Sequence, residues 1–350
     1  MESAEEVGTA QRWRRRARVL FLLCVGGVVA VVLVILSAPL WSYGELASHF
    51  RWHVGIGGAL FGLVTLLARQ WRPAVLLLAI GLWGVLPEGR LWLGSPETEA
   101  GNETIDVVCA NVLRINDLFG PVITEIIARD PDVIGLLEIS PEWRDEAVSQ
   151  LEARYPYHAE GLDTRRWNQF TWGMLLFSKT PLSDAVAIPV LRENRRLRPI
   201  LRAAVDLGGE PLTIDLVHAQ RPGATWRLAD RRKHFEALRE PMEARHRLVL
   251  GDLNTTSTSP LFTDLCERLD VRDSRPGFGR QPTLKLGSTL PGPVPIPIPG
   301  PLRVSVAIDH ALVSDGLAVL SRETFRIPGS DHRGIHVRLS VRNAGTARAK

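Results

Sequence analysis

Lysine and cysteine are both scarce in this chain. Only four of the 42 basic residues are lysines, and the rest are arginines. So strong an arginine bias, together with abundant Ala, Val, Leu and Gly, indicates a GC-rich bacterial genome. The three cysteines, Cys24, Cys109 and Cys266, are few and far apart. They therefore exclude both a disulfide framework and a cysteine-based zinc site.

A large excess of charge of one sign is also missing. The formal net charge of the 350 residues is +4, and residues 101–350 carry 33 basic and 31 acidic side chains. Proteins that bind nucleic acid without sequence preference have a strongly basic surface, because they neutralise many phosphates. The near-neutral balance argues against that class of protein.

Long apolar runs are confined to the first quarter of the chain. Residues 19–36 carry no charge, and at ~1.5 Å per residue the run is roughly 27 Å long, enough to cross a bilayer core. Shorter apolar runs follow at 54–68 and 73–87, with tryptophans near their ends, as is typical of membrane interfaces. We expect a membrane region with three transmembrane helices at 19–92.

Arginines set the expected orientation of these spans. Residues 1–18 contain five arginines close to the first span, and Arg69 and Arg72 mark the loop between the second and third. Basic loops stay in the cytoplasm. The N-terminus is therefore expected inside a bacterial cell membrane, and everything after residue 92 outside. A cleaved signal peptide is the alternative, but two further apolar runs follow the first one.

The remainder reads as a linker at 93–103, a soluble domain at 104–341 and a tail at 342–350. Its pattern mixes short apolar strands with amphipathic helices, which favours an α+β fold with two packed sheets and helices outside. Strands are expected at 105–110, 132–137, 173–178, 201–207, 212–218, 247–251, 304–313 and 335–341. Helices are expected at 121–129, 141–153, 226–240 and 259–269, with Pro121 and Pro141 in first helical positions.

Residues 291–301 read PGPVPIPIPGP, with proline at every second position. Proline lacks a backbone donor and has a fixed φ, so this segment is predicted to form an extended, polyproline-like loop. Two interpretations stay open: the loop packs on its own domain, or it leans on the membrane.

Polar residues recur where the predicted strands end. Taken singly, each is better explained by a helix cap, a turn or solvent contact than by a catalytic role. Taken as an ordered set, they supply carboxylate and amide oxygens, which suit Mg²⁺ or Mn²⁺, and imidazoles that can transfer protons or stabilise charge. The set is Asn111, Glu138, His218, Asp252, Asn254, Asp309, Asp331 and His332.

The order of these motifs resembles the endonuclease/exonuclease/phosphatase superfamily, which includes DNase I-like nucleases, neutral sphingomyelinases and inositol polyphosphate phosphatases. The matching blocks are VVCANV, DVIGLLEIS, WGMLLFSKTPL, LTIDLVHAQRP, LVLGDLNTTSTSP, AIDHALVS and SDHRGIHV. The resemblance implies a four-layer α/β/β/α sandwich and metal-assisted cleavage of phosphoesters at one end of its sheets.

The resemblance also implies a role for each residue. Asn111, Glu138 and Asp331 would hold the metal. Asp252 would orient or deprotonate the attacking water with Asn254 beside it, and His218 would contact the phosphate. His332 would stabilise the transition state, with Asp309 holding its ring. Many members carry a second polar residue two positions after the first Asn. Here that position is Leu113, which favours one metal ion over two.

Some conspicuous residues stay outside the site. His310 follows Asp309 in a strand and should face the other side. His158, His234, His246 and His336 are expected on the surface or in packing. A cluster of arginines has two open interpretations, a solvated loop or a phosphate-binding rim. Its members are Arg192, Arg195, Arg196, Arg198 and Arg202.

Three spans followed by such a domain resemble the teicoplanin-resistance membrane proteins of actinobacteria, which implies a lipid-linked cell-envelope phosphate as substrate. Two other functions remain open: an extracytoplasmic DNA nuclease, and a non-catalytic envelope-binding protein that keeps the fold. The near-neutral domain argues against the first, and the complete set of site residues argues against the second.

Overall fold

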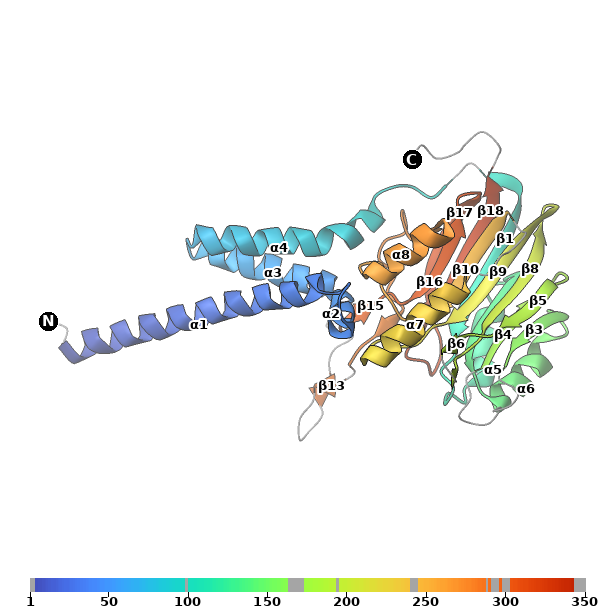
Figure 1. The fold of residues 1–350 in the computed structure, drawn as a ribbon, viewed down its shortest axis with the longest axis horizontal. Helices are drawn as coiled ribbons and strands as arrows, with labels where there is room; N and C mark the ends of the chain where they lie inside the picture. The colour runs from blue at the N-terminus through green and yellow to red at the C-terminus, as the bar shows by residue number, and fades with distance from the viewer. Residues whose placement is uncertain are drawn as a thin grey trace. The chain divides into compact units, whose positions relative to one another are not determined.

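The computed structural model describes residues 4–97, 100–162, 173–192, 195–239, 245–287, 289–290, 296–297 and 303–342. The chain divides into two compact units, Met1–Glu88 and Gly89–Lys350 (Figure 1). The second unit begins with the 3-10 helix η1 (Arg90–Trp92), and its first strand starts at Ala100, within the segment 93–103 predicted as a linker.

The first unit is helical. Its elements are α1 (Ala4–Leu36), α2 (Ser42–Ser48), α3 (Arg51–Leu67) and α4 (Trp71–Gly89). Glycines let α3 and α4 approach closely, since a Cβ on Gly84 would lie 2.5 Å from the Cα of Gly55. Close backbone contact through small residues is how membrane helices pack.

Within the described residues, two helical segments, Gln11–Leu36 and Trp71–Trp92, are long and apolar enough to cross a membrane. Helices α2 and α3, bent by 63° at the break between them, would together make a third. The number of spans stays between two and three on these criteria, so the prediction of three remains a prediction.

The second unit contains two six-stranded sheets, sheet A and sheet B. Sheet A has the order β17 (Leu317–Arg326), β18 (Arg333–Arg342), β1 (Ala100–Asn111), β2 (Val133–Ile139), β4 (Gly173–Ser178), β3 (Tyr157–Gly161). Sheet B has the order β11 (Val271–Asp273), β16 (Asp309–Ser314), β10 (His246–Asp252), β9 (Glu210–His218), β8 (Ile200–Leu207), β5 (Ser183–Ile188). Within each sheet, two central strands run parallel: β1 with β2, and β9 with β10.

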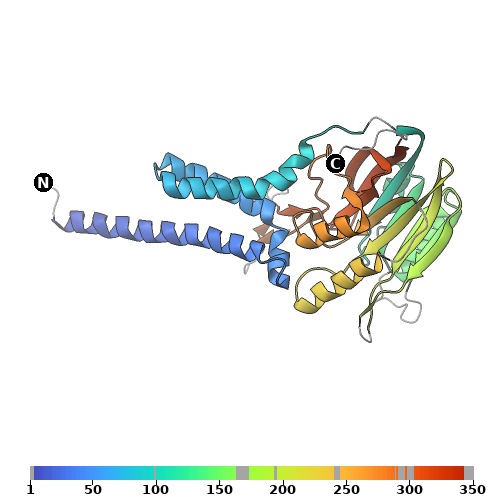
Figure 2. The ribbon, with the colours of Figure 1, turned by 45° about the horizontal axis from the view of Figure 1, so that its top comes forward.

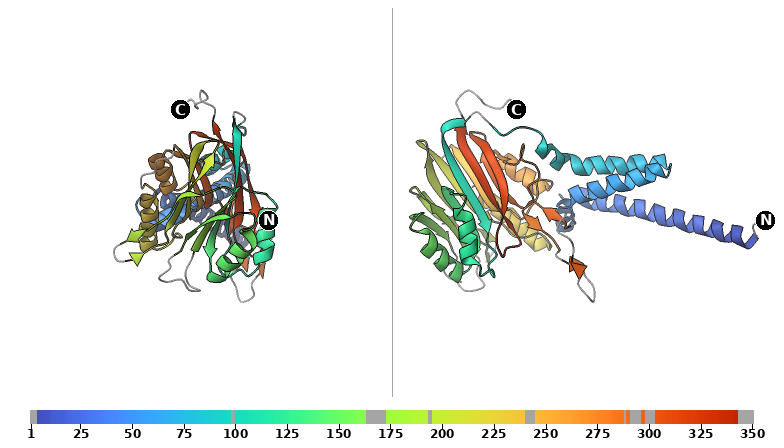
Figure 3. Two further views of the ribbon diagram at one scale, coloured as in Figure 1. Left: turned by 90° about the vertical axis from the view of Figure 1, so that its right-hand side faces the viewer. Right: turned by 180° about the vertical axis from the view of Figure 1, so that it is seen from behind.

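Among the described residues of the second unit, the buried hydrophobic side chains form three clusters, which define four layers (Figure 3). The largest cluster lies between the two sheets. A second joins sheet A to α5 (Phe119–Ile127) and α6 (Pro141–Leu151). The third joins sheet B to α7 (Thr225–Ala237) and α8 (Pro260–Leu269), the yellow and orange helices of Figure 2. The fold is therefore an α+β sandwich, as predicted.

Alternation along the strands produces this layering. In β1, Val107 and Cys109 point into the cluster between the sheets, whereas Val108 and Ala110 point toward α5 and α6. Successive side chains of a strand face opposite sides, so both faces must be apolar when both are covered. Gly135 marks a close approach of the sheets, since a Cβ there would lie 2.8 Å from a methyl of Leu216.

Several element predictions need correction. The predicted strand 304–313 is interrupted: β15 (Ser305–Val306) pairs with β12 (Leu284–Lys285), and β16 begins at Asp309. Helix α5 begins at Phe119, so Pro121 is not its first residue, whereas Pro141 is the first residue of α6. The long strand β17 was not predicted, because its half-exposed sequence breaks the apolar pattern with charged residues.

The proline-rich loop is described only in part. Thr289–Leu290 (β13) pairs antiparallel with Ile296–Pro297 (β14), so the two described residues of the predicted loop lie in a short strand pair. The other residues of 291–301 lie outside the described part of the chain. A second short pair, β6 (Leu191–Arg192) with β7 (Arg195–Arg196), precedes β8.

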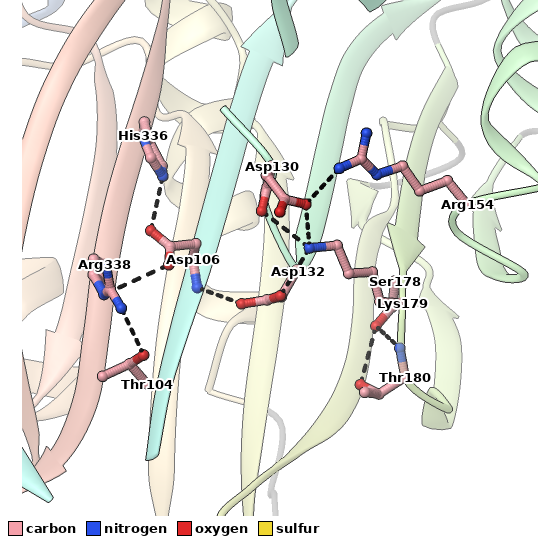
Figure 4. Close-up of polar contacts among 10 residues, drawn as sticks. All are labelled: Thr104, Asp106, Asp130, Asp132, Arg154, Ser178, Lys179, Thr180, His336 and Arg338. Carbon is pink, nitrogen blue, oxygen red and sulfur yellow. Dashed lines mark hydrogen bonds and ion pairs between the residues drawn. The ribbon is translucent and has the colours of Figure 1, made fainter. Parts of the chain in front are cut away.

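A network of polar contacts joins the strands of sheet A beside the start of β2 and the end of β4 (Figure 4). Asp106 accepts from His336 at 3.0 Å, and its backbone N–H donates to Asp132 at 2.9 Å. Lys179 pairs with Asp132 at 3.2 Å and with Asp130 at 2.5 Å. These contacts tie β18, β1, β2 and the end of β4 together, so His336 has a structural role, as predicted.

Candidate active site

Strand register in sheet B places three of the predicted site residues in one row. Asp252, the last residue of β10, pairs with His218 on β9 and with Asp309 on β16. Neighbouring residues across a ladder share one face of the sheet. The fold therefore brings together three residues that are separated by up to 91 positions in the sequence. The spacing of the motifs alone does not show this proximity.

Sheet A contributes two further polar residues, Asn111 and Glu138, from the ends of its parallel strands. Asn111 is the last residue of β1, and Glu138 stands in a bulge of β2, between Leu137 and Ile139. Glu138 has φ +61°, a left-handed conformation that costs a non-glycine residue ~1–2 kcal/mol. Strain of this kind is retained where the surrounding structure imposes it, and it is frequent at functional sites. The bulge re-aims the Glu138 side chain toward sheet B.

The two edges meet through buried polar contacts. Asn111 Nδ2 donates to Glu138 Oε1 at 3.1 Å and lies 3.4 Å from Asp252 Oδ2. His218 Nε2 lies 3.6 Å from both Glu138 Oε1 and Asp252 Oδ2. All four side chains are at least nine-tenths buried. They form a compact acidic group at the end of the sandwich where β1, β2, β9 and β10 terminate.

Asp309 and His332 form a second pair in the same region. His332 Nδ1 donates to Asp309 Oδ2 at 2.9 Å. Burial lowers the pKa of His332, but the Asp309 carboxylate outweighs it and raises that pKa to about 10. At neutral pH the His332 ring is therefore a protonated imidazolium, and its hydrogen bond to Asp309 keeps it in place. Two hydroxyls fix the pair: Thr283 accepts from the Asp309 backbone, and Ser330 accepts from the His332 backbone.

Burial and neighbouring charge also shift the other groups. Burial raises the pKa of Glu138, and Asn111 partly opposes it. Burial and the nearby Asp309 raise the pKa of Asp252. Burial, with Arg198 and His332 nearby, holds the pKa of His218 well below its usual value, so this ring is neutral. Paired shifts of opposite sign are characteristic of acid–base sites.

Asn254 and Asp331 complete the predicted set. Asn254 has φ +51°, its N–H donates to Asp252 Oδ1 at 2.9 Å, and its Nδ2 donates to the carbonyl of Ala219 at 3.1 Å. Its own carbonyl accepts from the fully buried Arg231 at 2.5 Å, a support that the sequence did not indicate. Asp331 is exposed next to His332, and its role as a metal ligand stays a prediction.

The donor set fits a divalent cation. Glu138 offers a buried carboxylate, Asn111 stands beside it, and hard oxygen donors suit Mg²⁺ or Mn²⁺. Ligand atoms of Asp252, Asp309 and His332 also lie within 4.8 Å of one another. The Asp309 carboxylate favours the protonated form of His332, which suits that trio to acid–base chemistry, and Glu138 and Asn111 are the residues that could hold a cation.

The structure also sorts the conspicuous residues outside this set. His310 faces away from the site, where its Nε2 donates to Thr255 O at 2.8 Å and its ring packs on Phe262. That prediction is confirmed. Arg202 forms a buried ion pair with Asp215 at 2.6 Å, so it is not part of a phosphate-binding rim. The side chains of Arg192, Arg195 and Arg196 lie outside the described part of the chain.

Comparison with known proteins agrees with this geometry. A model of the endonuclease/exonuclease/phosphatase family matches residues 69–332. Among solved structures, a family member from Beutenbergia cavernae is 20% identical, with a TM-score of 0.53 over 70% of this chain and 74% of that one. TDP2 of D. rerio, complexed with single-strand DNA product, is 16% identical, with a TM-score of 0.52 over 68% and 99%.

A family protein from Bacteroides thetaiotaomicron is 15% identical, with a TM-score of 0.53 over 71% of this chain and 98% of that one. At these identities the likeness concerns the fold alone. No curated protein matches the chain. The family model covers most of the sequence, including the strand ends that supply the site, so the chain belongs to the endonuclease/exonuclease/phosphatase family of phosphoester-hydrolysing enzymes.

Proposed function

We propose that this protein is a membrane-anchored, divalent-metal-dependent hydrolase of phosphoesters or phosphoanhydrides that acts on a lipid-linked cell-envelope phosphate at the outer face of the membrane. One observation carries the proposal. Buried carboxylates from two sheets, Glu138 and Asp252, converge on neutral His218, beside the ion pair of Asp309 and His332.

Asp252 is the residue best placed to act on the attacking water. Its raised pKa favours proton acceptance, and the backbone N–H of Asn254 orients one of its oxygens. His218, neutral and 3.6 Å away, can donate a hydrogen bond to a phosphate oxygen. These residues sit on strand ends, so their positions are fixed by the sheets and not by mobile loops.

His332 supplies positive charge where negative charge develops. Asp309 accepts from the His332 Nδ1–H, which leaves Nε2–H as the donor for a phosphoryl or leaving-group oxygen. Because the ring is already protonated, it can also give that proton to the departing oxygen. A divalent cation bound by Glu138 and Asn111 would polarise the phosphoryl group.

The membrane location rests on the first unit and on the arginine distribution. Apolar helices long enough to span a bilayer precede the catalytic unit, and arginines cluster before the first of them. Alkaline phosphatase fused after residue 345 should be active under this topology. Activity from a cytoplasmic reporter alone at that site would refute the outward orientation.

The deciding experiment uses the full chain in detergent micelles. It should hydrolyse a prenyl pyrophosphate or a phospholipid with Mg²⁺ and lose this activity with a chelator. Glu138→Gln and His332→Ala should each lose ~10²–10⁴-fold, as removal of such groups does elsewhere. The surface variant His158→Ala is the control. Nicking of plasmid DNA instead would favour a nuclease, and inactivity on every substrate would favour a non-catalytic binding protein.

A further inference from the structure

Of the two arginines of the predicted cluster whose side chains the structure describes, Arg198 lies at the site and Arg202 does not. Arg198 precedes β8, and its Nη1 donates to the carbonyl of Ala219 at 3.1 Å. The same carbonyl accepts from Nδ2 of Asn254, also at 3.1 Å. Two donors on one oxygen lie no more than about 6 Å apart at these hydrogen-bond lengths. The guanidinium is therefore next to Asn254, the partner of Asp252.

The surroundings of Arg198 are acidic and mostly dry. Burial lowers the pKa of its guanidinium, while the charges of Glu138 and Asp252 raise it. In turn Arg198 lowers the pKa of Glu138 and of His218. Arg198 is mostly buried but, unlike Arg202 and Arg231, not fully, so a bound ligand can reach it. A guanidinium keeps its charge in such a place because it is so weakly acidic.

Two cations therefore flank the acidic group from different elements. His332, which precedes β18 of sheet A, is held by Asp309. Arg198, which precedes β8 of sheet B, donates to the carbonyl of Ala219. This carbonyl directly follows His218 in the chain and also accepts from Asn254. A phosphate bound over the acidic group would meet His332 on one flank and Arg198 on the other. A planar guanidinium with several N–H donors matches two phosphate oxygens at once.

We propose that Arg198 binds the substrate phosphate directly and gives the site a preference for a phosphate that carries two negative charges, such as a monoester or the terminal group of a pyrophosphate, over a singly charged diester. This inference rests on the proposed function, because it names the substrate class of the same site. The second charge is what a second fixed cation recognises, whereas a diester has only one charge to share between His332 and Arg198.

The test compares substrates and variants in the full chain. For Arg198→Gln, kcat/KM on a prenyl pyrophosphate or a soluble phosphomonoester should fall about 10- to 100-fold, as for a lost hydrogen bond to a charged group. The loss on a soluble phosphodiester should be about threefold or less. Arg198→Lys keeps the charge without the planar fork and should restore part of the activity. Arg144→Gln, on a surface ion pair, is the matched control.

Binding of inorganic phosphate, followed by ³¹P NMR line broadening, gives a readout that does not need turnover. Arg198→Gln should weaken it, and Arg144→Gln should not. Unchanged phosphate binding, or equal losses on monoester and diester, would overturn the inference while leaving the proposed function standing. Phosphate binding that depends on Arg198 in a chain that hydrolyses nothing would support the inference and overturn the proposed function.

Discussion

Removing the charge of Glu138 should separate stability from activity. Glu138 Oε1 and Asp252 Oδ2 each lie 3.6 Å from His218 Nε2, so they are at most about 7 Å apart. At an effective dielectric constant near 20, two carboxylates at that separation repel by ~2 kcal/mol. Glu138→Gln abolishes this repulsion and the cost of burying the charge. It also exchanges a charge-assisted hydrogen bond from Asn111 for a neutral one, a loss of ~1–1.5 kcal/mol, and gives up the attraction to Arg198 and His332. The metal-free variant should therefore be as stable as the native chain, or up to ~1 kcal/mol more stable.

Divalent metal should reverse that order. A ligand that binds only the folded state stabilises it by ~2.7 kcal/mol at a hundred times its Kd. We expect Mg²⁺ to stabilise the native chain by about this amount and Glu138→Gln by well under 1 kcal/mol. Pulse proteolysis in urea at pH 8.5, with Mg²⁺ or EDTA, measures both values for the full chain in detergent. Glu146→Gln, on the exposed face of α6, is the control.

Two results would refute this reasoning. The first is a Glu138→Gln variant that is more than ~1 kcal/mol less stable than the native chain in EDTA. The buried carboxylate would then stabilise the fold, and the reasoning that its burial lowers stability would be wrong. If Mg²⁺ stabilised the variant as much as the native chain, the cation would bind elsewhere, and the assignment of the metal to Glu138 would be wrong.

Three further changes test the framework around the site by the same unfolding assay. Gly251→Ala should lower the free energy of unfolding by ~3–5 kcal/mol, since φ is +131° and the new Cβ would lie 2.2 Å from the carbonyl oxygen of Val217. The control Gly120→Ala, where the new Cβ would meet open space, should not lower it. Asp215→Asn should lower the free energy of unfolding by ~3–5 kcal/mol, because Arg202 and Arg247, which each pair with Asp215 at 2.6 Å, would be left as buried charges without their carboxylate. A loss under ~1 kcal/mol would contradict this. Burial lowers the pKa of His234 from 6.5 to about 4, so its contribution is complete above pH 6.5, and ~2 kcal/mol of it is lost by pH 5. The variant His234→Leu should lack that part of the pH dependence, and an identical acid sensitivity in both proteins would count against it.

The sequence by itself determined the sandwich and predicted most of the polar residues that the fold brings together at its edge. Continuous apolar runs such as LVLG and LLFS can be buried only when both faces of a strand are covered, which predicts two sheets with helices outside. Polar residues that end such runs cannot stay in the core, and so they gather at one edge. Local pattern also assigned Asp309 and His310 to opposite faces, because successive strand side chains alternate.

Only the tertiary structure decided which groups meet and what state they are in. Strand β17 escaped prediction because its pairing with β18, and not an apolar pattern, makes it a strand. The arginines at 198 and 202 look alike in sequence, yet the first reaches the site and the second is committed to Asp215. Likewise a histidine becomes an imidazolium at 332 and stays neutral at 218, because a carboxylate accepts from the first ring, whereas burial and nearby positive charge act on the second. Such differences arise from distances across the fold, which spacing along the chain does not encode.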